Sequence, residues 1–248
     1  MLFHANQSGF SSSPALEVYL LGIVDYESCL TLQERFLFDL SGRRDGAGVL
    51  LLCEHPPLIT IGREGSRAQI LCEPRELVAR RLETRWINRG GGAIVHGPGQ
   101  LACYPLIPLE RRGVGLAEFS RMMAESVLRT ARDQRITAHC TEKGSIFECR
   151  SGEFGMLGSA VKSWISYHGL FVNVNPLLDY ARLVAPQGTT GRITSLAAER
   201  MHPIGMHSVR ESLIRHIANL LGYERYHLYT GHPALKRTRR TYVHAGNH

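Results

Sequence analysis

Residues 89–108 read RGGGAIVHGPGQLACYPLIP, and this stretch constrains the fold more than any other part of the chain. Five of the thirteen residues at positions 89–101 are glycine. Glycine lets the backbone take a positive φ or lie against another molecule, because no Cβ intervenes. Such a run, directly before an apolar strand, indicates a pocket wall made of backbone, with Arg89 and His96 as its polar contacts. The alternative is a flexible hairpin in which His96 is an ordinary turn residue.

The segments around this run mix predicted helices and strands without a regular β-α-β alternation. Strands are expected where short apolar runs lie between turn residues: 16–24, 48–53, 58–61, 85–88, 101–107, 146–149, 155–161, 163–167 and 170–174. Helices are expected where apolar residues recur at helical spacing: 26–40, 74–82, 116–132 and 208–221. This order favours a single α+β domain whose sheet is mixed or largely antiparallel.

The composition is that of an ordinary globular protein, with 248 residues of which 44% are hydrophobic and 21% charged. We expect a disordered lead-in at residues 1–14, a folded domain at 15–223 and a flexible basic tail at 224–248. No run approaches the roughly 18 apolar residues that span a bilayer, and the first residues lack the pattern of a signal peptide. We therefore expect a cytoplasmic protein that does not act at a membrane.

The six cysteines have irregular spacings and form no C-x-x-C pair. This pattern indicates reduced thiols and no disulfide framework. No second pair of ligands accompanies His139, Cys140 and Cys149, so we expect no metal site. We also expect no cofactor. The formal net charge of +7 favours acidic partners. Because no helix-turn-helix, zinc finger or aromatic stacking motif accompanies the charge, nucleic acid is not the expected partner. We expect a monomer.

A second informative stretch, residues 155–175, reads GMLGSAVKSWISYHGLFVNVN. Its successive small residues Gly158, Ser159 and Ala160 would let a ligand or another backbone come close. His168 and Gly169 then open another apolar strand. The pattern indicates either a tight hairpin with a surface histidine or a second pocket wall, narrow and apolar, which would suit an alkyl chain.

Together these segments resemble the octanoyltransferases of lipoate synthesis, the lipoate–protein ligase B type. The resemblance rests on four sets of residues: EHPP at 54–57 with TIGR at 60–63, RGG at 89–91 with HGPGQL at 96–101, HGL at 168–170 with NVN at 173–175, and TSL at 194–196. It spans about residues 16–222 and implies a biotin/lipoate-ligase-like fold, with an acyl pocket bounded by the run at 89–96, the small residues at 158–160 and the strand that begins at 168. The substrate-binding residues it implies are Arg89, Gly90, Gly91, Gly92, Ala93, His96, Gly97, Gly158, Ser159, Ala160, His168, Gly169, Leu170 and Phe171.

The resembled family moves an octanoyl group from acyl carrier protein to a lysine of a lipoyl domain, so the resemblance implies these two protein partners. Its chemistry passes through a cysteine thioester. In this chain Gln187 stands where that cysteine is expected, and Gly155 or Met156 stands where a catalytic lysine is expected. A related type of octanoyltransferase has its cysteine in an earlier loop, and Cys140 falls on that position. Cys140 is therefore the candidate nucleophile, and the alternative is a cysteine with no catalytic role.

Two classes of function stay open at this point. The first is an octanoyltransferase that uses Cys140 or forms no covalent intermediate. The second is a binding protein of the same family that holds an acyl group, or an acylated protein, without transferring it. A ligase that activates free lipoate or biotin with ATP is less favoured, because no phosphate-binding loop is visible in the sequence.

Overall fold

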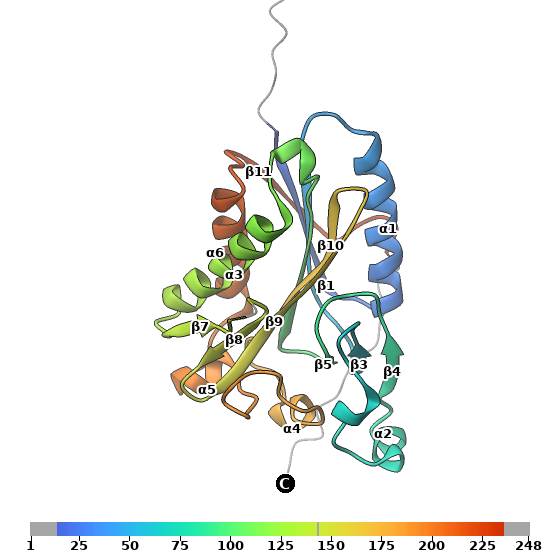
Figure 1. Cartoon of the computed structure of the whole chain (residues 1–248), viewed down its shortest axis with the longest axis vertical. Coiled ribbons are helices and arrows are strands. Elements are labelled where there is room, and N and C mark those ends of the chain that lie inside the picture. Colours follow the sequence, from blue (N-terminus) through green and yellow to red (C-terminus); the bar gives the residue numbers. More distant parts are fainter. Residues whose placement is uncertain (1–13, 143, 236–248) are drawn as a thin grey trace, which may run out of the picture.

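The computed structural model describes residues 14–142 and 144–235 of the chain (Figure 1). Its strands are β1 (Leu16–Ile23), β2 (Gly48–Glu54), β3 (Leu58–Ile61), β4 (Glu83–Trp86), β5 (Ala93–His96), β6 (Gln100–Leu106), β7 (Ala138–Cys140), β8 (Ile146–Cys149), β9 (Gly152–Lys162), β10 (Ile165–Asn173) and β11 (Tyr226–Thr230). Its α-helices are α1 (Tyr26–Gly42), α2 (Pro74–Ala79), α3 (Leu116–Asp133), α4 (Leu178–Ala181), α5 (Leu196–Arg200) and α6 (Met206–Leu220). Two 3₁₀ turns, Arg67–Gln69 and Glu110–Arg112, complete the described elements.

Eight of the strands form one mixed sheet in the order β11-β1-β2-β6-β10-β9-β8-β7. Strand β1 pairs in parallel with β11 and β2, and the other neighbours are antiparallel. A smaller sheet, β4-β3-β5, lies beside it. The expectation of one α+β domain with a mixed, largely antiparallel sheet is confirmed.

Helices cover both faces of the large sheet, with α3 and α6 on one face and α1 on the other (Figure 1). Successive side chains of a strand point to opposite faces. In β2, Leu50 and Leu52 therefore join the core under α3 and α6, while Val49 and Leu51 join the core under α1. A strand buried on both sides reads as a continuous apolar run, which is why β2 was predictable.

Strand β11 corrects the expected domain boundary. It pairs with β1 from Leu16↔Tyr226 to Leu20↔Thr230, so the folded domain continues beyond residue 223 and no flexible tail begins at 224. All five β11 residues are exposed, and the strand was not predicted although Tyr226, Leu228 and Tyr229 are residues typical of strands. The lead-in up to residue 13 and the end of the tail, residues 236–248, lie outside the described residues.

Two further details position the site. Strand β5 forms inside the glycine-rich run, where no strand was predicted, because it pairs with β3 through Leu58↔His96 and Ile61↔Ala93. Strand β10 runs unbroken through His168 and Gly169, although His168 has a φ of 53°. Among the described helices, none is long and apolar enough to cross a membrane.

Candidate acyl-binding site

Arg89 is fully buried (0% exposed), and its guanidinium donates hydrogen bonds to other groups of the protein. Its Nε and Nη2 donate to Thr60 Oγ1 at 3.1 and 2.9 Å, and Nη2 also donates to the carbonyls of Thr60 and Gly92 at 2.9 and 2.8 Å. Its Nη1 donates to Gly90 O at 2.8 Å. Burial lowers the pKa of Arg89 to about 10, which leaves it charged at neutral pH. Arg89 therefore shapes the glycine run from within, in place of the expected contact with a ligand.

His96 is also held on both ring nitrogens. The Thr60 hydroxyl accepts from Arg89, so its own proton goes to His96 Nε2 at 2.8 Å. The Gln100 amide donates to Val95 O and Asn173 Oδ1, so its Oε1 accepts from His96 Nδ1 at 2.8 Å. Burial lowers the pKa of His96 well below its usual value. The neutral imidazole consequently orients Gln100 and has no lone pair left for proton transfer.

The two predicted pocket walls touch each other directly. The backbone N–H of Gly90 donates to Ser159 O at 3.3 Å, and a Cβ at Gly158 would meet the Gly90 carbonyl at 2.9 Å. The small residues of β9 thus serve backbone packing against the run. His168 and Gly169 lie in buried β10, where Gly169 packs against the Cys103 carbonyl of β6.

Leu170 and Phe171 of β10 are buried in the two cores that sandwich the large sheet. The Phe171 ring packs against His96, with 4.9 Å between ring centroids, and lies 5.7 Å from the Arg89 guanidinium. The structure thus brings the predicted segments together, but it packs them tightly and leaves the open space beside them.

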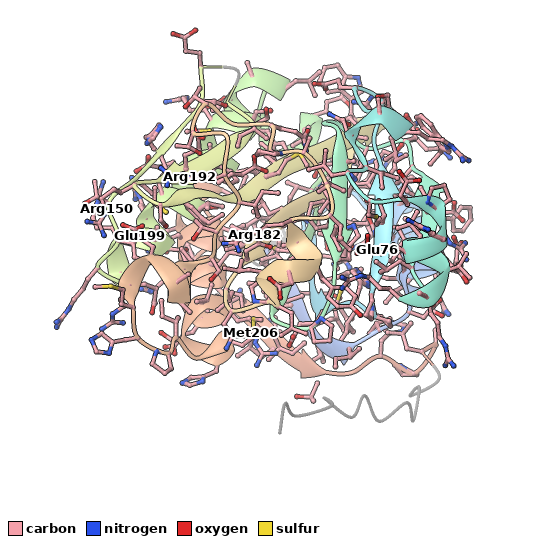
Figure 2. The ribbon with its side chains drawn as sticks, turned by 90° about the horizontal axis from the view of Figure 1, so that it is seen from below. Glu76, Arg150, Arg182, Arg192, Glu199 and Met206 are labelled. Atoms are coloured by element: carbon pink, nitrogen blue, oxygen red, sulfur yellow. The ribbon has the colours of Figure 1, made fainter. Side chains whose placement is uncertain are left out.

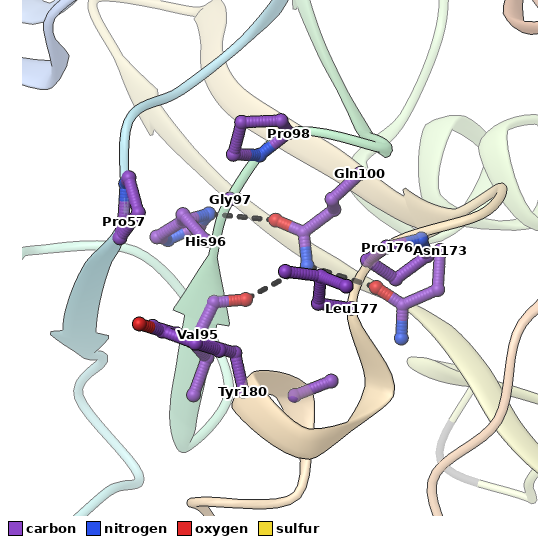
Figure 3. Close-up of a pocket in the computed structure, with 11 residues that line it drawn as sticks. Pro57, Val95, His96, Gly97, Pro98, Gln100, Asn173, Pro176, Leu177 and Tyr180 are labelled. Carbon is purple, nitrogen blue, oxygen red and sulfur yellow. Dashed lines mark hydrogen bonds between the residues drawn. The ribbon is translucent and has the colours of Figure 1, made fainter. Parts of the chain in front are cut away.

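That open space is a cavity of about 160 Å³ next to His96 and Gln100 (Figure 3). Its wall is mostly apolar and consists of Pro57, Val95, His96, Gly97, Pro98, Gln100, Asn173, Pro176, Leu177, Tyr180 and Ala181. An apolar cavity of roughly 150 Å³ is large enough to hold benzene. Of the predicted substrate-binding residues, His96 and Gly97 line it. Sequence reasoning missed the part of the wall that is formed by α4 and the residues before it, because nothing in that segment marks it as part of a site.

A second cavity of about 30 Å³ adjoins the first. The two share the wall residues Val95, Gln100, Asn173 and Ala181. Among the residues that line only the smaller cavity are Ala93, Glu153, Met156 and Phe171. The predicted residues Ala93 and Phe171 therefore reach open space here, at the inner end of the site.

Gln187 stands where the resemblance leads us to expect a cysteine, and its side chain is bonded to the glycine run. Its Oε1 accepts from Gly92 N at 2.6 Å, and its Nε2 donates to Ala93 O at 2.8 Å. Met156 fills further space, since a Cβ on Gly91, whose φ is +75°, would collide with the Met156 sulfur. Gln187 lacks the chemistry of the expected cysteine, and neither Gly155 nor Met156 has the chemistry of the expected lysine.

Two buried carboxylates hold the loop that carries Gln187. Glu153 Oε2 accepts the backbone N–H groups of Gln187 and Gly188 at 2.7 and 2.9 Å. Glu148 accepts from Thr189 Oγ1 at 2.7 Å and from Thr190 N at 2.8 Å. Sequence reasoning missed both, although a glutamate within an apolar strand pattern is an unusual residue to bury and was a usable signal.

Cys140 lies on β7, at the edge of the large sheet. Its half-buried side chain packs against the core under α3 and α6, whereas the apolar residues around the small cavity belong to the other two cores. Burial raises the pKa of the Cys140 thiol. A thiol needs a lowered pKa to act as a nucleophile, so the structure shows no activation of Cys140 and places it in neither cavity.

Cys29, Cys53 and His55 form the one group within residues 14–142 and 144–235 whose spacing could hold a metal ion. Their ligand atoms all lie within 4.8 Å of one another, and all three residues are buried. His55 Nδ1 bonds to Val24 O at 2.7 Å, and its Nε2 accepts from the Tyr104 hydroxyl at 2.6 Å. The ring is therefore fully partnered within the protein and needs no metal to satisfy it.

The geometry of the chain matches known structures over most of its length. A bipartite lipoate protein ligase from Thermoplasma acidophilum superimposes with a TM-score of 0.68, covering 89% of each chain at 16% sequence identity. Identity this low shows the fold alone, and the fold is that of a lipoate protein ligase.

Sequence comparisons go further. The family model for the lipoyl protein ligase A/B catalytic domain matches residues 25–218. An octanoyltransferase from Roseiflexus sp. (strain RS-1) is 33% identical over 213 residues, 84% of this chain and 88% of that protein. An octanoyltransferase from Geotalea uraniireducens (strain Rf4) is 36% identical over 180 residues, 72% of this chain and 80% of that protein. The chain belongs to the lipoyl protein ligase A/B catalytic domain family, and the resemblance predicted from its motifs is confirmed.

Proposed function

We propose that this protein transfers an octanoyl group from acyl carrier protein to a lysine of a lipoyl domain, as a step of lipoate synthesis. The observation that carries the proposal is the apolar cavity beside His96 and Gln100, which joins a smaller cavity containing a carboxylate. Octanoyltransferases that match most of the chain support the same substrate.

The two cavities suit the two ends of an acyl thioester. The larger, apolar space would take the alkyl chain, because burying each methylene stabilises the complex by about 0.8 kcal/mol. The smaller space, between Gln100 and Glu153, would take the thioester carbonyl. This orientation puts the reacting atoms beside the loop that carries Gln187.

A charged groove supports an acidic protein as partner. It has a volume of about 520 Å³ and is lined by Arg135, Arg150 and Arg200 among other residues. Its carboxylate, Glu199, lies 3.6 Å from Arg150 and therefore neutralises only part of the positive charge (Figure 2). The groove includes Thr190, on the same loop as Gln187, so an acidic acyl carrier protein docked here would sit close to the acyl site.

Transfer in this protein would proceed without a covalent intermediate on Cys140. The thiol packs into a core away from both cavities, and its raised pKa keeps it protonated. In a direct transfer, the lysine amine attacks the acyl carrier protein thioester while both protein substrates are bound.

A second function, acyl binding without transfer, is favoured by one observation. Gln187 stands where the resemblance leads us to expect the nucleophile, and Gly155 or Met156 stands where it leads us to expect the lysine. Such a protein would hold octanoyl-acyl carrier protein and leave it intact.

Incubation of the protein with octanoyl-acyl carrier protein and a lipoyl domain separates the two functions. The proposal expects octanoyl-lysine on the lipoyl domain, detected by mass spectrometry of its peptides. Binding of the acylated carrier protein with no octanoyl-lysine at any pH would support the second function and reject the first.

A further inference from the structure

Glu153 brings a buried carboxylate to the small cavity at the start of β9. The residue is 8% exposed and lines this cavity with Gly155 and Met156. Its Oε2 accepts two backbone N–H groups from the loop at Gln187. Its Oε1 makes no hydrogen bond to any residue within the described ranges, and it is not among the fully enclosed unpartnered atoms. One oxygen is therefore held in place while the other is available to a bound molecule.

No other titratable group around the two cavities matches this position. His96 has both ring nitrogens occupied, by Thr60 and Gln100. Tyr180 stands on the outer wall formed by α4, and its ring packs against Arg80, 5.1 Å from the guanidinium carbon to the ring centroid. Among the described residues that line the cavities, Glu153 is thus the group best placed to accept a proton at the inner end.

The environments of Glu153 and Glu148 shift the pKa values of the two carboxylates in opposite directions. Burial raises the pKa of Glu153, and the negative charge of Glu148 on β8 adds to the rise. Burial also acts to raise the pKa of Glu148, but hydrogen bonds from Thr189 and Thr190 outweigh it and leave that pKa below its usual value. Paired carboxylates whose pKa values are pushed apart are typical of sites where one of them moves protons.

We propose that Glu153 is the general base of the octanoyl transfer, and that the acceptor lysine attacks the thioester directly. This inference rests on the proposed function and names its proton acceptor. General bases of this kind have pKa values tuned towards the working pH by burial and by neighbouring charge.

The step balances without any further reactant. The lysine ammonium first loses one proton to solvent, and its neutral amine attacks the thioester carbonyl carbon. Glu153 takes the second proton from nitrogen as the C–N bond forms. The C–S bond then breaks, and the departing sulfur of acyl carrier protein receives this proton from Glu153. The products are an octanoyl amide and a free thiol, with the Glu153 carboxylate restored.

Glu153→Gln isolates this role from the anchoring of the loop. A glutamine keeps an oxygen that accepts the N–H groups of Gln187 and Gly188, but it cannot take up a proton. We expect kcat/KM for transfer to fall roughly 10²-fold or more, with the fall in kcat, while the thermal midpoint and the affinity for octanoyl-acyl carrier protein stay near the wild-type values. Glu148→Gln is the matched comparison, because it neutralises the other buried carboxylate on the same loop, and we expect a much smaller fall.

The pH dependence supplies a second readout. Below the raised pKa of Glu153, log(kcat/KM) should rise with slope 2, since Glu153 and the lysine must both lose a proton; above it the slope should be 1. Glu148 is the charged neighbour that acts on Glu153, and Glu148→Gln should move the break to lower pH. In Glu153→Gln the break should disappear.

The outcomes separate this inference from the proposed function. If the wild type is active and Glu153→Gln is equally active, or if both glutamine variants lose the same activity, Glu153 is not the general base. Either result would leave the proposed transferase function intact. A wild type that transfers nothing would reject the function and the base together. A large loss confined to Glu153→Gln, with the break in the pH profile removed, supports the inference.

Discussion

The side-chain oxygen of Gln187 accepts a hydrogen bond from the backbone N–H of Gly92 at 2.6 Å, joining residues 95 positions apart in the sequence. The amide nitrogen of the same side chain donates to Ala93 O at 2.8 Å. A cysteine at this position could make neither bond with comparable strength. Where the family resemblance leads us to expect a nucleophile, Gln187 therefore links its loop to the glycine run.

Gln187→Ala should remove both hydrogen bonds between this loop and the glycine run. The change leaves Gly92 N–H and Ala93 C=O without their partners, and each unmet backbone group costs about 1–3 kcal/mol where water cannot reach it. Because two such groups lose their partner, we expect the free energy of unfolding to drop by about 2–6 kcal/mol in urea titrations, with faster amide hydrogen exchange at Gly92. Unchanged exchange at Gly92 would show that the bond does not hold the run.

Cys140→Ser should leave transfer close to the wild-type rate. The thiol lies against the core under α3 and α6, and burial raises its pKa, so it offers neither proximity nor a thiolate. The measurement is kcat/KM with octanoyl-acyl carrier protein and a lipoyl domain. A loss of activity in a variant that remains folded by circular dichroism would restore Cys140 as the nucleophile.

Arg89→Lys should destabilise the fold although it keeps the charge. The guanidinium serves Thr60, Gly90 and Gly92 with a planar set of donors, and an ammonium cannot reproduce that geometry. We expect a loss of about 3 kcal/mol or more in the free energy of unfolding, because several buried acceptors lose their donors. Arg121→Lys, at an exposed arginine on α3 whose nearest carboxylate, Glu118, is 4.0 Å away, is the control and should change little.

Tyr180→Ala should shift the preferred acyl length upward. Tyr180 forms part of the cavity wall, and its removal would make room for two more methylenes, worth about 1.6 kcal/mol at 0.8 kcal/mol each. The ratio of kcat/KM for decanoyl over octanoyl donors should therefore rise about tenfold. Arg80→Ala removes the cation that packs on the Tyr180 ring without touching the cavity, and an equal shift in that variant would contradict this assignment.

The sequence was most informative where burial follows a period. The helices α1, α3 and α6 and the strands β2 and β6 were predictable because their apolar residues recur at fixed spacings and face defined cores. Strands β5 and β11 were not, since β5 is built into a glycine run and β11 lies at the exposed edge of the sheet, and both pair with strands distant in the sequence.

The site was predictable as a location and less so as a mechanism. The motifs bring Arg89, His96 and Gly158 together, but the structure uses Arg89 and His96 as internal supports. Whether a polar side chain is fully hydrogen-bonded within the protein or is available to a ligand depends on partners far away in the sequence. Glu153 shows this, since its environment is set by a loop 34 residues further on.

The central claim is that octanoyl passes directly from acyl carrier protein to the lipoyl domain on this protein. A single-turnover reaction, quenched over time and followed by the intact mass of all three proteins, tests it most directly. We predict that the lipoyl domain gains one octanoyl group while this protein is never found acylated. A lipoyl domain that stays unmodified, or an octanoyl thioester on this chain that forms and then decays into product, would contradict the account.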